Sequence, residues 1–293
     1  MMTQSDTLLI YVMYLSSLTY FLGVLFYALP IPVEGVKRWA PTLIKDSIYS
    51  LVWLSIYNDV INLANYILHK ILNLSWTGYF GSIYLMSTGV TAQFVALEII
   101  KSITMPVTSI MSFFLKSSST TTATTTSNGI SSLVSSLTGN SLNILIHQTQ
   151  TIMMSLYFII ILSDVIYYGM PWLLSLGVLL MSLPFRIGRS VGATLISTVL
   201  VFYIGLPGMA SLMNFIYLQG FGAFGISILI FTLASIVFSS AGLTNILLVL
   251  PIEYVSFVVA PMAYITTLII ISLGLDRVIA ESANQFPLPK KLI

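Results

Sequence analysis

Long apolar stretches without charge alternate with short polar segments along this chain of 293 residues. Residues 8–29 and 220–250 hold no charged side chain, and residues 252–275 hold only Glu253. A helix needs about 20 predominantly apolar residues to cross a bilayer core, whereas a strand of a membrane barrel needs about 10 residues that alternate in polarity. The runs are long and do not alternate, so the pattern predicts membrane-spanning helices.

The composition supports the same interpretation. Apolar residues make up 57% of the chain and charged residues only 7%, with a mean hydropathy of +0.99. Soluble domains carry about 25% charged residues, so this chain has too few to cover itself with a water-facing surface. We therefore expect an all-α, polytopic helical protein embedded in the lipid bilayer.

Counting the apolar segments predicts about seven transmembrane helices, within a range of six to eight. The first span covers residues 8–29, and the two final spans, 220–250 and 252–275, are separated by Pro251. The apolar segments between them cover residues 48–68, 79–116, 144–168, 171–183 and 190–206. Proline bends or ends a helix, so Pro106 marks either a bend in one long helix or the boundary between a span and a surface helix. Pro171 begins a short apolar stretch of its own.

Residues 117–141 differ from the rest of the chain, because they are nearly all Ser, Thr, Gly and Asn. Such a tract cannot bury enough apolar area to offset the entropy of ordering its backbone, which predicts a flexible loop. The alternative is a loop that docks a partner or carries O-linked sugars. The loop divides N-terminal membrane helices, residues 1–116, from a C-terminal membrane core with a short cytoplasmic tail, residues 142–293.

The distribution of basic residues predicts the orientation. Residues 30–47 form an expected short loop, whose basic residues are Lys37, Arg38 and Lys45. Positively charged loops lie in the cytoplasm, so the N-terminus is expected outside. An odd number of spans then places the C-terminus, with Arg277, Lys290 and Lys291, in the cytoplasm.

Polar residues recur within the second predicted span. Asn58, Asn62, Asn65 and His69 follow one another at spacings of four, three and four, which places them on one face of a helix. Asp59 adjoins this stripe, and an intramembrane carboxylate is costly unless it is paired or hydrated. The stripe either lines an aqueous path, with Asp59 as a relay for protons or ions, or forms hydrogen bonds between helices.

Three further acids fall within or near the predicted spans. Glu98 precedes Lys101 by three residues, a spacing that permits an ion pair on one helix. Asp164 and Glu253 lie close to the expected ends of spans, where water among the lipid headgroups can reach them. We expect structural or interfacial roles for these acids, and a proton or ion relay is the alternative.

Several kinds of chemistry find no support in the sequence. The chain has no cysteine and two histidines, so we expect no metal site and no cofactor. Glycines at 220, 222 and 225 spell a dinucleotide-binding pattern, but they open an apolar span rather than a βαβ unit, and predict close helix packing instead. Gly188 and Gly192 predict a helix contact for the same reason. No catalytic constellation is present, and we do not expect an enzyme.

Arg186 and Arg189 lie one helical turn apart after a short apolar stretch. They serve either as anchors on the cytoplasmic side, as the positive-inside rule expects, or as contacts for an anionic lipid, a partner ATPase or a translocating polyanion.

Three short segments carry a family resemblance. They read Gly-Met-Pro-Trp at residues 169–172, Leu-Pro-Phe-Arg-Ile-Gly-Arg at 183–189 and Gly-Leu-Pro-Gly at 205–208. This region resembles the central segment of the polytopic channel subunits of type IV secretion systems, the TrbL-like family. In particular, it resembles their archaeal relatives in the crenarchaeal DNA-import (Ced) system.

The resemblance implies a membrane channel subunit for DNA import in an archaeal cell membrane. The implied partners are DNA as the transported substrate, a hexameric ATPase and small pilin-like membrane proteins. The matching positions, Pro171, Trp172, Phe185, Arg186 and Arg189, would organise the pore. A homo-oligomeric ring would multiply Arg186 and Arg189, which compensates for the weakly basic character of one protomer.

Two other functions remain open from the sequence. A small-solute or ion transporter would use Asp59 and its neighbouring stripe. A membrane assembly platform for a surface filament would use the Ser/Thr-rich segment and the basic cytoplasmic ends to bind partners.

Overall fold

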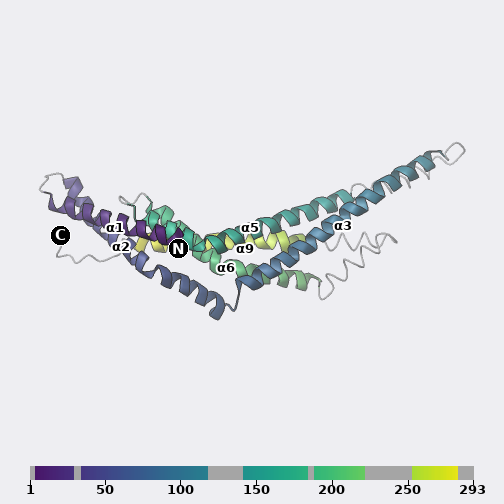
Figure 1. Ribbon diagram of the computed structural model, residues 1–293. Helices are drawn as coiled ribbons and strands as arrows, with labels where there is room; N and C mark the ends of the chain where they lie inside the picture. The colour runs from purple at the N-terminus through teal and green to yellow at the C-terminus, as the bar shows by residue number, and fades with distance from the viewer. Residues whose placement is uncertain (1–3, 30–33, 118–140, 184–187, 222–252, 283–293) are drawn as a thin grey trace. The chain divides into compact units, whose positions relative to one another are not determined.

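The computed structural model describes residues 4–29, 34–117, 141–183, 188–221 and 253–282, and every regular element in these ranges is a helix. The predicted all-α fold is therefore confirmed. The elements are α1 (Gln4–Ala28), α2 (Glu34–Tyr66), the π-helical turn η1 (Ile67–Ile71), α3 (Trp76–Ser117), α5 (Ser141–Met181), α6 (Arg189–Phe221), the π-helical turn η5 (Val255–Val259) and α9 (Ala260–Ser282) (Figure 1). Apart from their first or last residues, the predicted loop 117–141 and the predicted span 220–250 lie outside the described residues.

Within the described residues, five helical segments are long and apolar enough to cross a membrane. They are Ser5–Ala28, Trp76–Ile103, Asn143–Met181, Arg189–Tyr217 and Val255–Glu281. The predicted span 48–68 forms the second half of α2, which is less apolar because Asn58, Asp59 and Asn62 interrupt it. The count of seven spans stays a prediction.

Two prolines lie inside continuous helices: Pro106, for which a bend or a boundary was expected, and Pro171, which was expected to begin a separate stretch. α3 runs through Pro106 as one helix, and α5 runs through Pro171, so the predicted stretches 144–168 and 171–183 are one element. The hydroxyl of Tyr57 donates a hydrogen bond of 2.7 Å to the carbonyl oxygen of Pro171. Neighbouring side chains that satisfy the backbone around a proline allow membrane helices to continue through it.

Most of the expected loop 30–47 is helical, because α2 already begins at Glu34. Ala40, Leu43, Ser47 and Ser50 are buried, and their spacings of three, four and three place them on one helical face. Gly23 of α1 approaches this segment closely, since an added Cβ atom would lie 2.8 Å from Cγ1 of Ile44. Packing against α1 therefore stabilises as a helix a segment that was expected to be a loop because of its charged residues.

The chain divides into two compact units. Unit 1 comprises Met1–Tyr79, Leu162–Met209 and Ala263–Ile293, and unit 2 comprises Phe80–Ile161 and Ala210–Met262. α3, α5, α6 and α9 each contribute residues to both units, which are described separately below.

Unit 1 contains a close crossing of α5 and α6. A Cβ atom added at Gly192 would lie 2.5 Å from the carbonyl oxygen of Gly177 and 2.6 Å from Cγ of Met181. Glycines allow helix backbones to approach within a membrane, and the helix contact predicted for Gly192 is confirmed.

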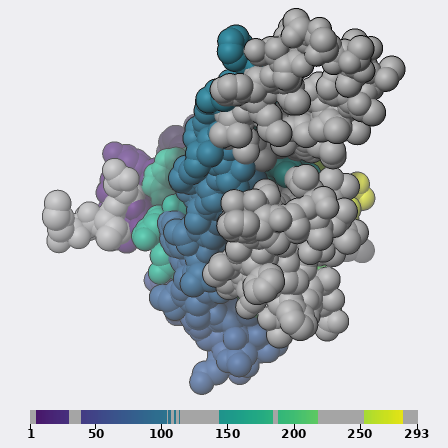
Figure 2. Space-filling view, turned by 90° about the vertical axis from the view of Figure 1, so that its right-hand side faces the viewer, coloured from purple at the N-terminus to yellow at the C-terminus, as the bar shows by residue number. Residues whose placement is uncertain are grey.

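Unit 2 pairs α3 with the first half of α5. Leu97 of α3 packs with Leu145 and Ile146 of α5, and Phe94 and Ile100 flank this cluster. α3 is exposed along much of its length (Figure 2), and its large exposed residues include Tyr84, Leu85, Val95, Ile99 and Ile103. This apolar surface suits contact with lipid chains.

Candidate functional site

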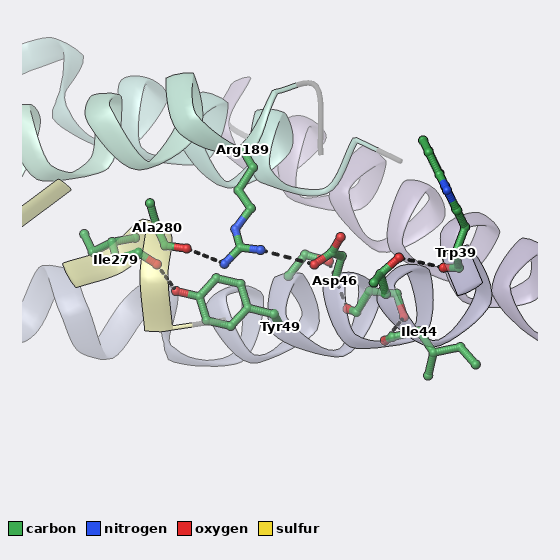
Figure 3. Close-up of polar contacts among 10 residues, drawn as sticks. Trp39, Ile44, Asp46, Tyr49, Arg189, Ile279 and Ala280 are labelled. Carbon is green, nitrogen blue, oxygen red and sulfur yellow. Dashed lines mark hydrogen bonds and ion pairs between the residues drawn. The ribbon is translucent and has the colours of Figure 1, made fainter. Parts of the chain in front are cut away.

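A buried ion pair joins α6 to α2 in unit 1. Nη1 of Arg189 lies 3.3 Å from Oδ1 of Asp46, and these residues are 7% and 6% exposed (Figure 3). Nη2 of Arg189 donates a second hydrogen bond to the carbonyl oxygen of Ala280, near the end of α9. One guanidinium group thus connects three helices that are far apart in the sequence.

Tyr49 completes the surroundings of Arg189. The guanidinium carbon lies 5.5 Å from the centre of the Tyr49 ring, a distance at which a cation is attracted to an aromatic face. The Tyr49 hydroxyl donates a hydrogen bond of 2.8 Å to the carbonyl oxygen of Ile279 (Figure 3). Arg189 is therefore engaged by a carboxylate, a carbonyl and a ring, and its guanidinium group holds the helices together rather than facing solvent.

The same contacts bring three chain segments to one end of unit 1: the part of α2 around Asp46, the beginning of α6 and the end of α9. A hydrogen bond of 3.4 Å from Thr19 Oγ1, in the second half of α1, to the carbonyl oxygen of Ser182, directly after α5, adds these two helices to the group. These are the segments whose basic residues were expected on the cytoplasmic side.

The polar stripe of α2 lies mainly on the surface of the protomer. Asn58, Asp59, Asn62 and His69 are exposed. Asn65 is partly buried, and its Oδ1 atom accepts a hydrogen bond of 2.8 Å from the hydroxyl of Tyr203 on α6. The stripe therefore combines Asn65, which binds a neighbouring helix, with three exposed residues, and the adjoining Asp59 is exposed as well.

The family-like segment is only partly described. Pro171 and Trp172 are exposed on α5, and the carbonyl oxygen of Pro171 accepts the bond from Tyr57. Phe185 and Arg186 lie outside the described residues, so Arg189 is the described member of the predicted arginine pair. The roles suggested for these five positions stay predictions.

Two buried acids were not recognised as such in the sequence. Asp46 was expected in a loop, and Glu253 was expected within reach of headgroup water. Glu253 is 3% exposed, and its Oε1 atom accepts a hydrogen bond of 3.0 Å from Nε2 of Gln93. The helical spacing of the residues around Asp46 could have revealed its burial, whereas Glu253 had no such pattern.

No group of three or more His, Cys, Asp or Glu side chains that could hold a metal ion occurs in the part of the chain that the structure describes. The main polar features described above are a buried ion pair, an exposed polar stripe and a buried carboxyl group.

Comparison with known proteins identifies relatives. A family model described as "DNA import protein CedA1" matches residues 1–70, which include α1 and α2. Over 284 residues the chain is 33% identical to the "DNA import protein CedA" of Sulfolobus acidocaldarius, covering 96% of each chain. No solved structure matches the chain. An identity of this level over nearly the whole length shows that the chain belongs to the CedA family of DNA import proteins.

Proposed function

We propose that this protein is a membrane channel subunit for DNA import in a type IV secretion-like DNA exchange system. The observation that carries the proposal is the similarity to a protein named for DNA import, which extends over 96% of both chains. The match extends over nearly the whole chain, so the proposal concerns the whole protein rather than a shared segment.

The exposed stripe of α2 supports an oligomeric channel. Asn58, Asp59, Asn62 and His69 extend over 11 positions, about 17 Å along a helix axis. Amide and carboxylate groups that face lipid are costly, so such residues normally face water or another protein. In a ring of protomers the stripe would line a shared aqueous path or meet the neighbouring subunit.

The chemistry of the stripe suits a moving polyanion. Lys and Arg side chains bind DNA phosphates strongly, and a conduit has to release what enters it. Amide groups solvate the DNA without that strong attraction, and Asp59 opposes tight binding. Arg189 is buried and paired with Asp46. We therefore propose that Arg186, the other arginine of this region, contacts DNA or a partner.

The energy for import would come from a partner, since the sequence holds no P-loop of the kind that binds ATP. We propose a hexameric ATPase on the cytoplasmic side and small pilin-like proteins in the membrane, as in the TrbL-like systems that the chain resembles. The C-terminus and the ion-pair end of unit 1 would face the cytoplasm, with the N-terminus outside.

Variants in a deletion strain test the proposal. Asn58→Leu combined with Asn62→Leu should lower DNA import while membrane abundance stays normal, because both amides are exposed on the protomer. The matched control is Leu63→Ala, which changes an exposed apolar residue on the same helix and should leave import unchanged.

A pull-down from native membranes with a C-terminal tag tests the partners. Recovery of a secretion-type ATPase with small hydrophobic membrane proteins would support the channel. If the purified protein alone instead transports a small solute, and Asp59→Asn abolishes that transport, the proposal fails in favour of a transporter.

A further inference from the structure

Unit 2 buries one carboxyl group, that of Glu253. The residue precedes η5 and is 3% exposed. Within the described ranges its hydrogen-bond partner is the Gln93 amide of α3, at 3.0 Å. An amide is neutral, so this contact does not supply the positive charge that normally accompanies a buried carboxylate.

The next turn of the same helix is packed on two other helices. The Phe257 ring lies 5.3 Å from that of Tyr217 on α6, and the Phe257 carbonyl accepts a hydrogen bond of 3.1 Å from Ser155 on α5. Ser256 and Phe257 are buried. Helices α3, α5 and α6 thus enclose the segment that carries Glu253.

The titratable and charged groups of these helices are few. Tyr217 of α6 lies close enough to interact electrostatically with Glu253, and Tyr254 follows Glu253 directly in the sequence. On α3, Glu98 and Lys101 follow Gln93 by five and eight positions, about 8 and 12 Å along the helix axis. On α5, Tyr157 lies two positions after Ser155, and His147 lies eight positions before it, again about 12 Å away.

An ionised carboxylate enclosed in this way carries a large desolvation cost, which the uptake of a proton removes. Two effects oppose protonation. The Gln93 amide donates to the carboxyl group, and a position in the first turn of a helix would place the group near backbone N–H groups. A single neutral hydrogen bond is weak compared with the cost of burying an unpaired charge, so burial decides the balance.

We propose that Glu253 is a proton-binding site in unit 2, whose carboxyl group takes up a proton from water and holds it as the neutral acid. Oε1 accepts the Gln93 hydrogen bond in this state. The adjoining η5 is a π-helical turn, and such turns are frequent at functional sites. Loss of the proton would create a buried charge beside η5. The inference does not depend on what the protein transports.

Labelling with dicyclohexylcarbodiimide tests the site, because this reagent modifies protonated carboxyl groups in apolar surroundings. The full-length protein in lipid vesicles is labelled over a range of pH, and modified peptides are quantified by mass spectrometry. At neutral pH Glu253 should be labelled on the order of tenfold more than the exposed Asp59, as expected for a buried against a hydrated carboxyl group. The labelling should decline as the pH rises.

Three variants make the result specific. Glu253→Gln keeps the size and polarity of the side chain and should remove the labelled peptide. Gln93→Leu removes the donor that favours the charged form, so labelling should extend to higher pH. Glu98→Gln, the matched control on α3, should leave the labelling of Glu253 unchanged.

Other outcomes would overturn the proposal. Equal labelling of Glu253 and Asp59, or no labelling of Glu253 at mildly acidic pH, would mean that the carboxyl group is hydrated or ionised. Protection by sodium ions at constant pH would identify a metal-cation site instead. Because the assay needs neither DNA nor an ATPase, its failure would leave the proposed DNA channel untouched.

Discussion

Arg189 and Asp46 are separated by 143 positions in the sequence, and their side chains meet at 3.3 Å inside unit 1. The pair ties the beginning of α6 to α2, while the second nitrogen of the guanidinium group holds the end of α9. Removal of either partner leaves a buried charge without compensation, which is far more costly than the loss of a surface ion pair.

We therefore expect Arg189→Met and Asp46→Leu to destabilise the protein individually by about 3–5 kcal/mol. Thermal unfolding of the full-length protein in detergent measures the effect. The double variant buries no unpaired charge at this position, so its loss of stability should be clearly smaller than the sum of the single losses. Additive losses would mean that the two charges do not interact.

The long apolar runs revealed the helical class, but the pairing of Arg189 with Asp46 could not be read from one sequence. Arg189 looked like an anchor at a membrane surface, and Asp46 looked like part of a charged loop. Their partnership depends on how α1 and α6 pack on α2. In the same way, Pro171 was interpreted as a boundary. The hydrogen bond that its carbonyl oxygen accepts from Tyr57, 114 positions away, could not be inferred from the sequence.

The crossing of α5 and α6 makes a prediction about glycine. Gly192→Ala should destabilise the protein by about 1–3 kcal/mol, because the new methyl group would overlap the Gly177 carbonyl oxygen and Met181. Gly274→Ala in α9 is the matched control, since nothing lies within 4 Å of a Cβ atom there. The control should be neutral or gain up to about 1 kcal/mol from helix propensity. Equal behaviour of both variants in thermal unfolding would contradict the close crossing.

The polar stripe shows a further limit of sequence reasoning. Helical spacing placed Asn58, Asn62 and Asn65 on one face, but it could not distinguish solvation of a path from hydrogen bonding between helices. In the structure these asparagines differ: Asn65 accepts a hydrogen bond from Tyr203, whereas Asn58 and Asn62 are exposed. The burial of Glu253 was equally hidden, because it depends on Gln93, which is 160 positions away in the sequence.

This difference predicts different consequences for neighbouring asparagines. Asn65→Ala leaves the buried hydroxyl of Tyr203 without its acceptor and should lower stability by about 1–3 kcal/mol. The double variant Asn65→Ala and Tyr203→Phe should lose little more stability than either single variant. Asn62→Ala should leave thermal unfolding unchanged, within about 0.5 kcal/mol. A destabilising Asn62→Ala would indicate that this residue, too, is held by a partner within the protomer.

The orientation can be measured directly, because the natural chain has no cysteine and every introduced thiol is unique. Leu72 and Glu281 are exposed positions, and α2 carries the chain away from the ion-pair end of unit 1 toward Leu72. The 26 positions from Asp46 to Leu72 correspond to about 39 Å of helix, enough to cross the hydrocarbon core of a bilayer. The two positions should therefore lie on opposite sides of the membrane.

With the ion-pair end in the cytoplasm, Leu72→Cys should react with a membrane-impermeant maleimide on intact cells, and Glu281→Cys should react only after the cells are opened. A thiol at Tyr27, an exposed position near the end of α1, should behave like that at Glu281 and serves as an independent control for the same side. The reverse pattern would invert the orientation without affecting the fold, since the contacts among α2, α6 and α9 hold in either direction. Reaction of both Leu72→Cys and Glu281→Cys on intact cells would mean that α2 does not cross the bilayer, and the polar stripe would then lie outside any transmembrane path.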